Sequence, residues 1–139
     1  MTFTDRIISK AREALGTPFS HQGRYVGKAL DCAGLLIFVA KELDLEYIDA
    51  PTYSRNPSDS LLEEALDRQP CLYRVYDNNP IAGDVLLMRF TGDPQHLGIC
   101  TGSNLIHAWE PPGKVCEHTL TGDWRRRIVS IYRFKDYNV

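Results

Sequence analysis

The sequence predicts an α+β domain in which helices from the first half pack on an antiparallel sheet from the second half. Apolar residues recur at helical spacing up to residue 67, whereas short, turn-bounded runs typical of strands dominate after Pro70. A length of 139 residues suits one hydrophobic core, and neither a repeat nor a low-complexity linker divides the chain. Residues 1–139 are therefore predicted to form a single domain.

Three helices are expected in the first half. The first carries apolar residues at helical spacing from Ile7 to Leu15, with Thr2 or Thr4 as its cap and Gly16 as its stop. The second runs from residue 32 to residue 43 and is apolar on nearly every face, which predicts a helix buried on all sides and packed on the sheet. The third is short and is expected over residues 58–67.

The second half predicts a meander of five antiparallel strands. The expected strands cover residues 85–90, 97–101, 105–109, 115–119 and 128–134. The Gly-rich stretch between the first two helices is expected to be irregular.

Composition excludes several classes of function. The formal charge of −2, from 16 basic and 18 acidic residues, argues against nucleic acid as a partner. No apolar run approaches the length of a membrane helix, so membrane insertion is not expected, and no cofactor is predicted. The four cysteines stand at 32, 71, 100 and 116 without a CxxC spacing, which excludes a zinc ribbon or a thioredoxin motif. The N-terminus does not resemble a signal peptide, so we expect free thiols and synthesis in a reducing cytoplasm.

Cys32 is the first candidate for chemistry, because it begins the buried helix. The positive end of the helix dipole favours a thiolate, which predicts a depressed pKa, and the free N–H groups of the first turn can hold an oxyanion. A small, buried structural residue is the other interpretation of a free cysteine. Position alone does not choose between the two.

Two histidines favour the catalytic interpretation. Residues 96–102 and 103–107 read as a hairpin that turns at Gly102-Ser103 and sets Gly98 opposite His107. Side chains alternate along strands, so His96 and His107 are predicted on one face as diagonal neighbours. Cys32 would then be the nucleophile, His96 its general base, and His107 the residue that orients His96. The order of cysteine before histidine is that of papain-like enzymes.

Four short motifs follow one another along the chain: Asp31-Cys32-Ala33-Gly34-Leu35-Leu36, Ala82-Gly83-Asp84-Val85-Leu86, His96-Leu97-Gly98-Ile99 and Ile106-His107-Ala108. Together they resemble the motifs of the NlpC-type cell-wall cysteine peptidases, a papain-like family. Two further segments, Gly23-Arg24 and Trp124–Ile128, resemble the subgroup carried in phage tails.

This resemblance implies a papain-like fold and a Cys–His–His triad of Cys32, His96 and His107. It also implies cleavage of an amide in the peptidoglycan stem peptide, such as the bond between D-glutamate and diaminopimelate. A phage tail-tip hub protein would be the partner, and the virion tail at the bacterial cell wall the location, with the bacterial cytoplasm as the alternative.

The chain departs from the family at two positions near the cysteine. Phe19 stands where family members often have a tyrosine, so Tyr25 is the candidate for the missing hydroxyl, and Ala33 replaces a serine. The candidates for substrate binding or the oxyanion site are Phe19, His21, Tyr25, Asp31 and Ala33.

Other chemistry-bearing residues receive structural interpretations. His118 lies in a late strand with no expected partner, Cys71 and Cys116 fill space, and the arginines at 125–127 form a solvated face. The two tryptophans are expected to line a cleft or to pack in the core. A metal site of Cys32, His96, His107 and Cys100 ranks below catalysis.

Two other functions remain open. One is a catalytically silent tail-assembly protein that keeps the same fold. The other is an acyltransferase on a related thiol fold, which the order of cysteine before histidine disfavours.

Overall fold

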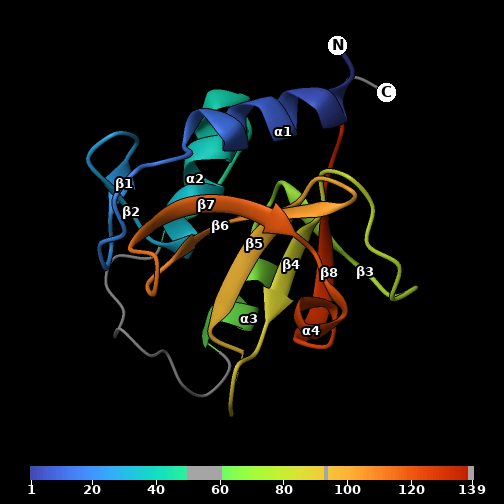
Figure 1. Cartoon of the computed structure of the whole chain (residues 1–139). Helices are drawn as coiled ribbons and strands as arrows, with labels where there is room; N and C mark the ends of the chain where they lie inside the picture. The colour runs from blue at the N-terminus through green and yellow to red at the C-terminus, as the bar shows by residue number, and fades with distance from the viewer. Residues whose placement is uncertain (50–60, 93, 138–139) are drawn as a thin grey trace.

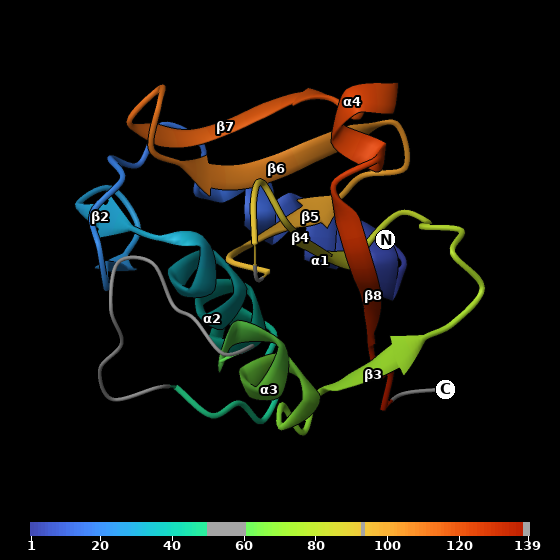
Figure 2. The ribbon, with the colours of Figure 1, turned by 90° about the horizontal axis from the view of Figure 1, so that it is seen from below.

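A computed structural model describes residues 1–49, 61–92 and 94–137, and it has the predicted α+β architecture (Figure 1). The longer helices are α1 (Phe3–Glu13) and α2 (Cys32–Glu42), followed by the short α3 (Leu61–Asp67). Helix α2 packs on strands β5 (His96–Cys100) and β6 (Asn104–Trp109), and α1 packs on α2 and β5. Figure 2 shows α2 and α3 on the same side of the sheet. The expectation that the apolar helix lies against the sheet is confirmed.

The sheet contains six antiparallel strands in the order β3-β8-β4-β5-β6-β7. Strands β4 (Val85–Met88), β5, β6 and β7 (Lys114–Thr119) form the predicted meander. The last strand, β8 (Ile128–Phe134), does not extend it but inserts between β4 and an edge strand, β3 (Leu72–Val75). Sequence patterning missed β3 because it is only four residues long and includes polar Arg74, and it missed the one-turn helix α4 (Gly122–Arg125).

The first two helices begin where the sequence predicts. Thr2 caps α1 and forms a reciprocal capping box with Asp5. Asp31 caps α2, because its carboxylate accepts from the Gly34 N–H at 2.7 Å. The third helix is described only from Leu61, so the first residues of the predicted span, 58–60, lie outside the described part of the chain.

A small hairpin of β1 (Arg24–Tyr25) and β2 (Ala29–Leu30) holds the start of α2, where an irregular stretch was expected. A Cβ on Gly34 would lie 2.1 Å from the Gly23 carbonyl oxygen, so the two backbones touch at a distance that only glycine allows. This close approach positions the first turn of α2, and with it Cys32.

The predicted hairpin of β5 and β6 is confirmed, since Cys100 pairs with Leu105 and Gly102 turns with a φ of 109°. Leu97 and Ile99 join the core that includes α2, whereas Cys100 and Leu105 belong to a second cluster that Trp124 covers. One face of this hairpin therefore packs in the core with α2, and the other face packs in the cluster that Trp124 covers.

Among the described residues, no helix combines the length and apolar character needed to cross a bilayer.

Candidate active site

His96 and His107 meet directly, as the hairpin predicts. Nε2 of His96 lies 2.6 Å from Nδ1 of His107, and both rings are buried. Gly98 makes room for this pair, because a Cβ at that position would lie 3.1 Å from Cβ of His107 and 2.6 Å from a methyl group of Leu105. The hydrogen bond orients the His96 ring, which is the geometry that a general base and its orienter require.

Cys32 occupies the first residue of α2 and is half-buried. The backbones of Ala33 and of Leu97, the residue after His96, act on its sulfur and favour the thiolate. The structure therefore brings the thiol to the start of β5. Within the described residues, the contact between Cys32 and the histidine strand runs through backbone, and no hydrogen bond joins the sulfur to the His96 ring.

The predicted depression of the Cys32 pKa is wrong for this arrangement. Burial, together with the negative charge of Asp31, raises the pKa of the thiol to about 12. The backbones of Leu97 and Ala33 and the charge of Arg24 lower the pKa, but their combined effect is smaller. The helix dipole favours the thiolate, but the cost of removing a thiolate from water is larger.

The histidines are shifted in the complementary direction. Burial lowers the pKa of His96 to about 4, and burial with the neighbouring rings lowers the pKa of His107. A buried thiol and a buried neutral imidazole are therefore the resting species, rather than a thiolate–imidazolium pair. A neutral His96 is able to accept a proton, so deprotonation of Cys32 has to accompany its attack on a substrate.

His118 has a partner, which corrects the expectation that it has none. Its Nε2 lies 2.8 Å from Nε2 of His107, and its Nδ1 lies 3.0 Å from the Thr119 carbonyl oxygen. The sequence did not reveal this contact, because the predicted hairpin gave a register for β5 and β6 only. In the β6–β7 pairing, His107 stands opposite Cys116, which places His118 on the same face as a diagonal neighbour of His107.

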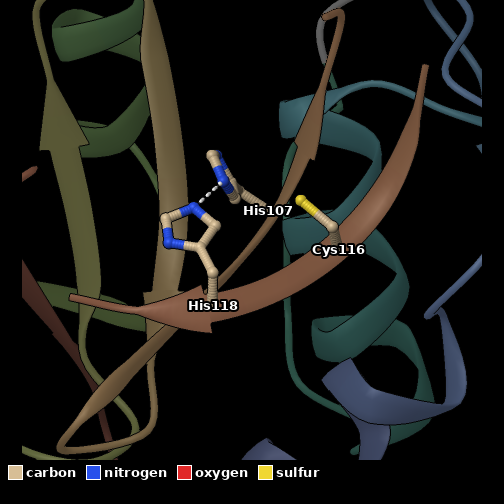
Figure 3. Close-up of side chains that lie close together, drawn as sticks. All are labelled: His107, Cys116 and His118. Carbon is tan, nitrogen blue, oxygen red and sulfur yellow. Dashed lines mark hydrogen bonds between the residues drawn. The ribbon is translucent and has the colours of Figure 1, made fainter. Parts of the chain in front are cut away.

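His107, Cys116 and His118 also form the one group of potential metal ligands found among the described residues, with donor atoms within 4.8 Å of one another (Figure 3). Two imidazoles and a thiol suit zinc. The set that sequence analysis considered, with Cys32 and Cys100, does not assemble there. The nitrogens of His107 and His118 already share a hydrogen bond at 2.8 Å.

The remaining predicted site residues surround the start of α2. Asp31 is buried and its carboxylate accepts from the backbone of Gln22 and Gly34 and from Arg24, so it holds the helix rather than donating to an oxyanion. Ala33 follows Cys32 in the first turn of α2, and its backbone favours the thiolate. Phe19 packs against the core, His21 is half-buried, and Tyr25 is exposed on β1.

An aromatic and cationic pocket of about 580 Å³ adjoins the histidines. Phe90 lies against His96, and Trp109 and Trp124 lie against His107. The guanidinium of Arg127 stacks on Phe90 and Trp124, so it does not belong to a purely solvated face. The pocket is lined by Arg89, Phe90, Trp109, Thr121, Asp123, Trp124, Arg126 and Arg127.

Neither a protein-family profile nor a curated protein sequence matches the chain. Solved structures do match. The NlpC/p60 domain of the peptidoglycan hydrolase SagA superposes with a TM-score of 0.62 at 19% identity, covering 96% of this chain and 100% of that domain. The chain has the NlpC/p60 fold. The fold expected from the sequence motifs is thereby confirmed.

Two further NlpC/p60 structures show the range of proteins that share the fold. An NlpC/P60 family protein from Bacillus cereus matches with a TM-score of 0.67 at 20% identity, over 96% of this chain but 40% of that protein. RipD from Mycobacterium tuberculosis matches with a TM-score of 0.62 at 14% identity, over 96% of this chain and 97% of that one. RipD is described as a non-catalytic NlpC/p60 domain protein adapted to peptidoglycan binding. The fold therefore occurs with and without catalysis.

Proposed function

We propose that the chain is a cysteine peptidase that cleaves an amide bond of the peptidoglycan stem peptide. The observation that carries the proposal is the buried His96–His107 hydrogen bond at the strand whose backbone contacts the Cys32 sulfur. The NlpC/p60 fold of a peptidoglycan hydrolase domain supports the substrate class.

The mechanism assigns one task to each residue. The Cys32 sulfur attacks the amide carbonyl while its proton moves to His96, and the tetrahedral intermediate collapses to a thioester as His96 protonates the departing amine. His96 then removes a proton from water, the resulting hydroxide attacks the thioester carbonyl, and His96 returns the proton to the departing sulfur, which restores the thiol and releases the carboxylic acid product. His107 keeps the His96 ring in position. The first-turn N–H of Cys32 is the candidate donor to the oxyanion, because helix geometry leaves it without an intrahelical partner.

The pocket beside the histidines supports an acidic substrate. Asp123 pairs with Arg126, whereas neither Arg89 nor Arg127 pairs with a carboxylate among the described residues. Two uncompensated guanidiniums next to aromatic walls favour carboxylate-bearing peptides. A stem peptide that contains D-glutamate and diaminopimelate carries such groups.

Purified sacculi test the peptidase. Wild type is expected to release muropeptides cut within the stem, identified by mass spectrometry, and Cys32→Ala is expected to release none. Cys71→Ala is the matched control, since it removes another thiol from the core without touching the proposed site. Equal products from wild type and Cys32→Ala would overturn the proposal.

A silent binding protein is the second candidate, favoured by the raised pKa of Cys32 and by the existence of RipD. It predicts that wild type sediments with sacculi without releasing fragments. Co-sedimentation and muropeptide release measured on one sample separate the two candidates.

We also propose that the chain works in a phage tail tip, held by a hub protein, during penetration of the cell wall. The two segments that resemble the phage-tail subgroup both contact the site: Arg24 binds the Asp31 carboxylate, and Trp124 packs on His107. Mass spectrometry of purified virions is expected to detect the chain in tails. Its absence from virions would favour a cellular location.

A further inference from the structure

Three imidazoles form a hydrogen-bonded row across β5, β6 and β7. His96 Nε2 lies 2.6 Å from His107 Nδ1, and His107 Nε2 lies 2.8 Å from His118 Nε2. Figure 3 shows the second of these hydrogen bonds. The row ends at the carbonyl oxygen of Thr119, 3.0 Å from His118 Nδ1. Nδ1 of His96 stands at the other end.

The carbonyl decides where each proton lies when all three rings are neutral. A carbonyl oxygen only accepts, so His118 must carry its proton on Nδ1 and offer a lone pair at Nε2. His107 must then donate from Nε2, which leaves a lone pair on its Nδ1. His96 must in turn donate from Nε2. The remaining lone pair of the row is on Nδ1 of His96.

We infer that His118 is a positioning residue that acts through His107 to keep the Nδ1 lone pair of His96 available for the Cys32 proton. The use of that lone pair rests on the proposed peptidase function. The arrangement of protons does not, because it follows from the Thr119 carbonyl and the three ring contacts.

Burial makes His107 dependent on His118. His107 has no exposed surface, and its ring stacks on Trp109 and meets the edge of Trp124. Solvent therefore has no direct access to its Nε2, and His118 is the partner that satisfies this nitrogen. Without an acceptor there, nothing at this end of the row favours one neutral form of His107 over the other.

The spacing of the nitrogens favours a shared proton over a shared metal ion. Two imidazole nitrogens bound to one tetrahedral zinc at about 2.05 Å lie about 3.3 Å apart. The Nε2 atoms of His107 and His118 are 2.8 Å apart, the distance of a hydrogen bond. Cys116, which a metal would need as its third protein ligand, has no part in the row of protons.

Nitrogen-15 NMR of the full chain at neutral pH reads the proton positions without any assay of activity. The expected result is a proton on Nδ1 of His118 and on Nε2 of both His107 and His96. A proton on Nε2 of His118, or on Nδ1 of His107, would overturn the inference. If the expected pattern appears in a chain that cleaves no sacculi, the proton arrangement stands and its catalytic use falls with the proposed function.

Two variants of His118 test the coupling to catalysis. His118→Phe keeps a ring but removes the acceptor, so both neutral forms of His107 are expected, with kcat lowered about ten-fold and KM unchanged. His118→Gln supplies an amide oxygen to His107 Nε2 and is expected to restore the wild-type NMR pattern and most of kcat. Equal kcat in wild type and His118→Phe, or no rescue by His118→Gln, would overturn the positioning role.

Cys116→Ala is the matched control, because Cys116 on β7 stands opposite His107 on β6 but lies outside the row. It is expected to change neither the NMR pattern nor kcat. A bound metal ion makes the opposite prediction. If Cys116→Ala or treatment with EDTA has the same effect as His118→Phe, the cluster holds a metal ion and the inference is wrong.

Discussion

The two halves of the candidate site are held in place in different ways. At the helix end, Asp31 caps α2, accepts a hydrogen bond from Arg24 and precedes Cys32 in the chain. The close contact between the Gly23 and Gly34 backbones holds the first turn of the same helix. At the sheet end, three imidazole rings from three strands depend on the register of β5, β6 and β7. The nucleophile is thus positioned by a charged helix cap and a close backbone contact, and the base by pairing of rings across neighbouring strands. Changes at one end should leave the geometry of the other intact.

The largest expected effect comes from removing the reacting side chain at either end of the site. His96→Ala should lower kcat/KM by about 10³-fold, within the usual range for loss of a general base, and Cys32→Ser should cost at least as much. If the ends act as one unit, the double variant should be no slower than the slower single variant. Kinetics on a stem-peptide substrate measure this. Additive losses would show that Cys32 and His96 do not work together.

Acid should weaken the sheet end selectively. His96 has a pKa of about 4 in the fold against an ordinary value near 6.5, so protonation favours the unfolded chain. Its contribution, about 3 kcal/mol, is fully present above pH ~6.5 and is lost as pH falls toward 4. Urea unfolding from pH 7 to pH 4 checks this. His96→Gln should show a flatter pH dependence, and an equal slope in both proteins would contradict the assignment.

The helix end should respond to loss of its cap. Asp31→Ala removes the hydrogen bonds to Gly34 and Gln22 and leaves Arg24 without this partner, at an expected cost of about 2 to 3 kcal/mol in unfolding free energy. Asp49→Ala is the control, since Asp49 binds the same Arg24 at the surface and should cost less than about 1 kcal/mol. Thermal unfolding compares them, and equal losses would contradict the capping role.

The smallest expected effect comes from filling the space that Gly98 leaves beside His107. Gly98→Ala places a methyl group against Leu105 and His107, so it should cost about 1 to 2 kcal/mol and lower kcat. Gly92→Ala controls for adding a methyl group in open space, although its backbone φ of 70° adds strain. If Gly98→Ala destabilises the fold while kcat is unchanged, the packing at Gly98 does not position the histidines.

Sequence patterning predicted the parts that depend on neighbouring residues or on one tight turn. The start of α2 and the β5–β6 hairpin are confirmed because a cap and a two-residue loop have few alternatives. Patterning identified β8 as a strand but not its place between β3 and β4, and it missed β3 and the partner of His118. These features depend on partners brought together across a longer loop or from distant parts of the chain. It also gave the wrong direction for the Cys32 pKa, because burial is a property of the packed fold.

By itself, the sequence determined the α+β class, the place of Cys32 at a helix start and the shared face of His96 and His107. These follow from helical and strand periodicity, which act over a few residues. Only the tertiary structure decided that β8 returns beside β4, that burial raises the pKa of Cys32 and lowers that of His96, and that His118 extends the histidine pair to the Thr119 carbonyl. Strand order, desolvation and side-chain pairing across strands arise when distant segments meet, so no local pattern encodes them.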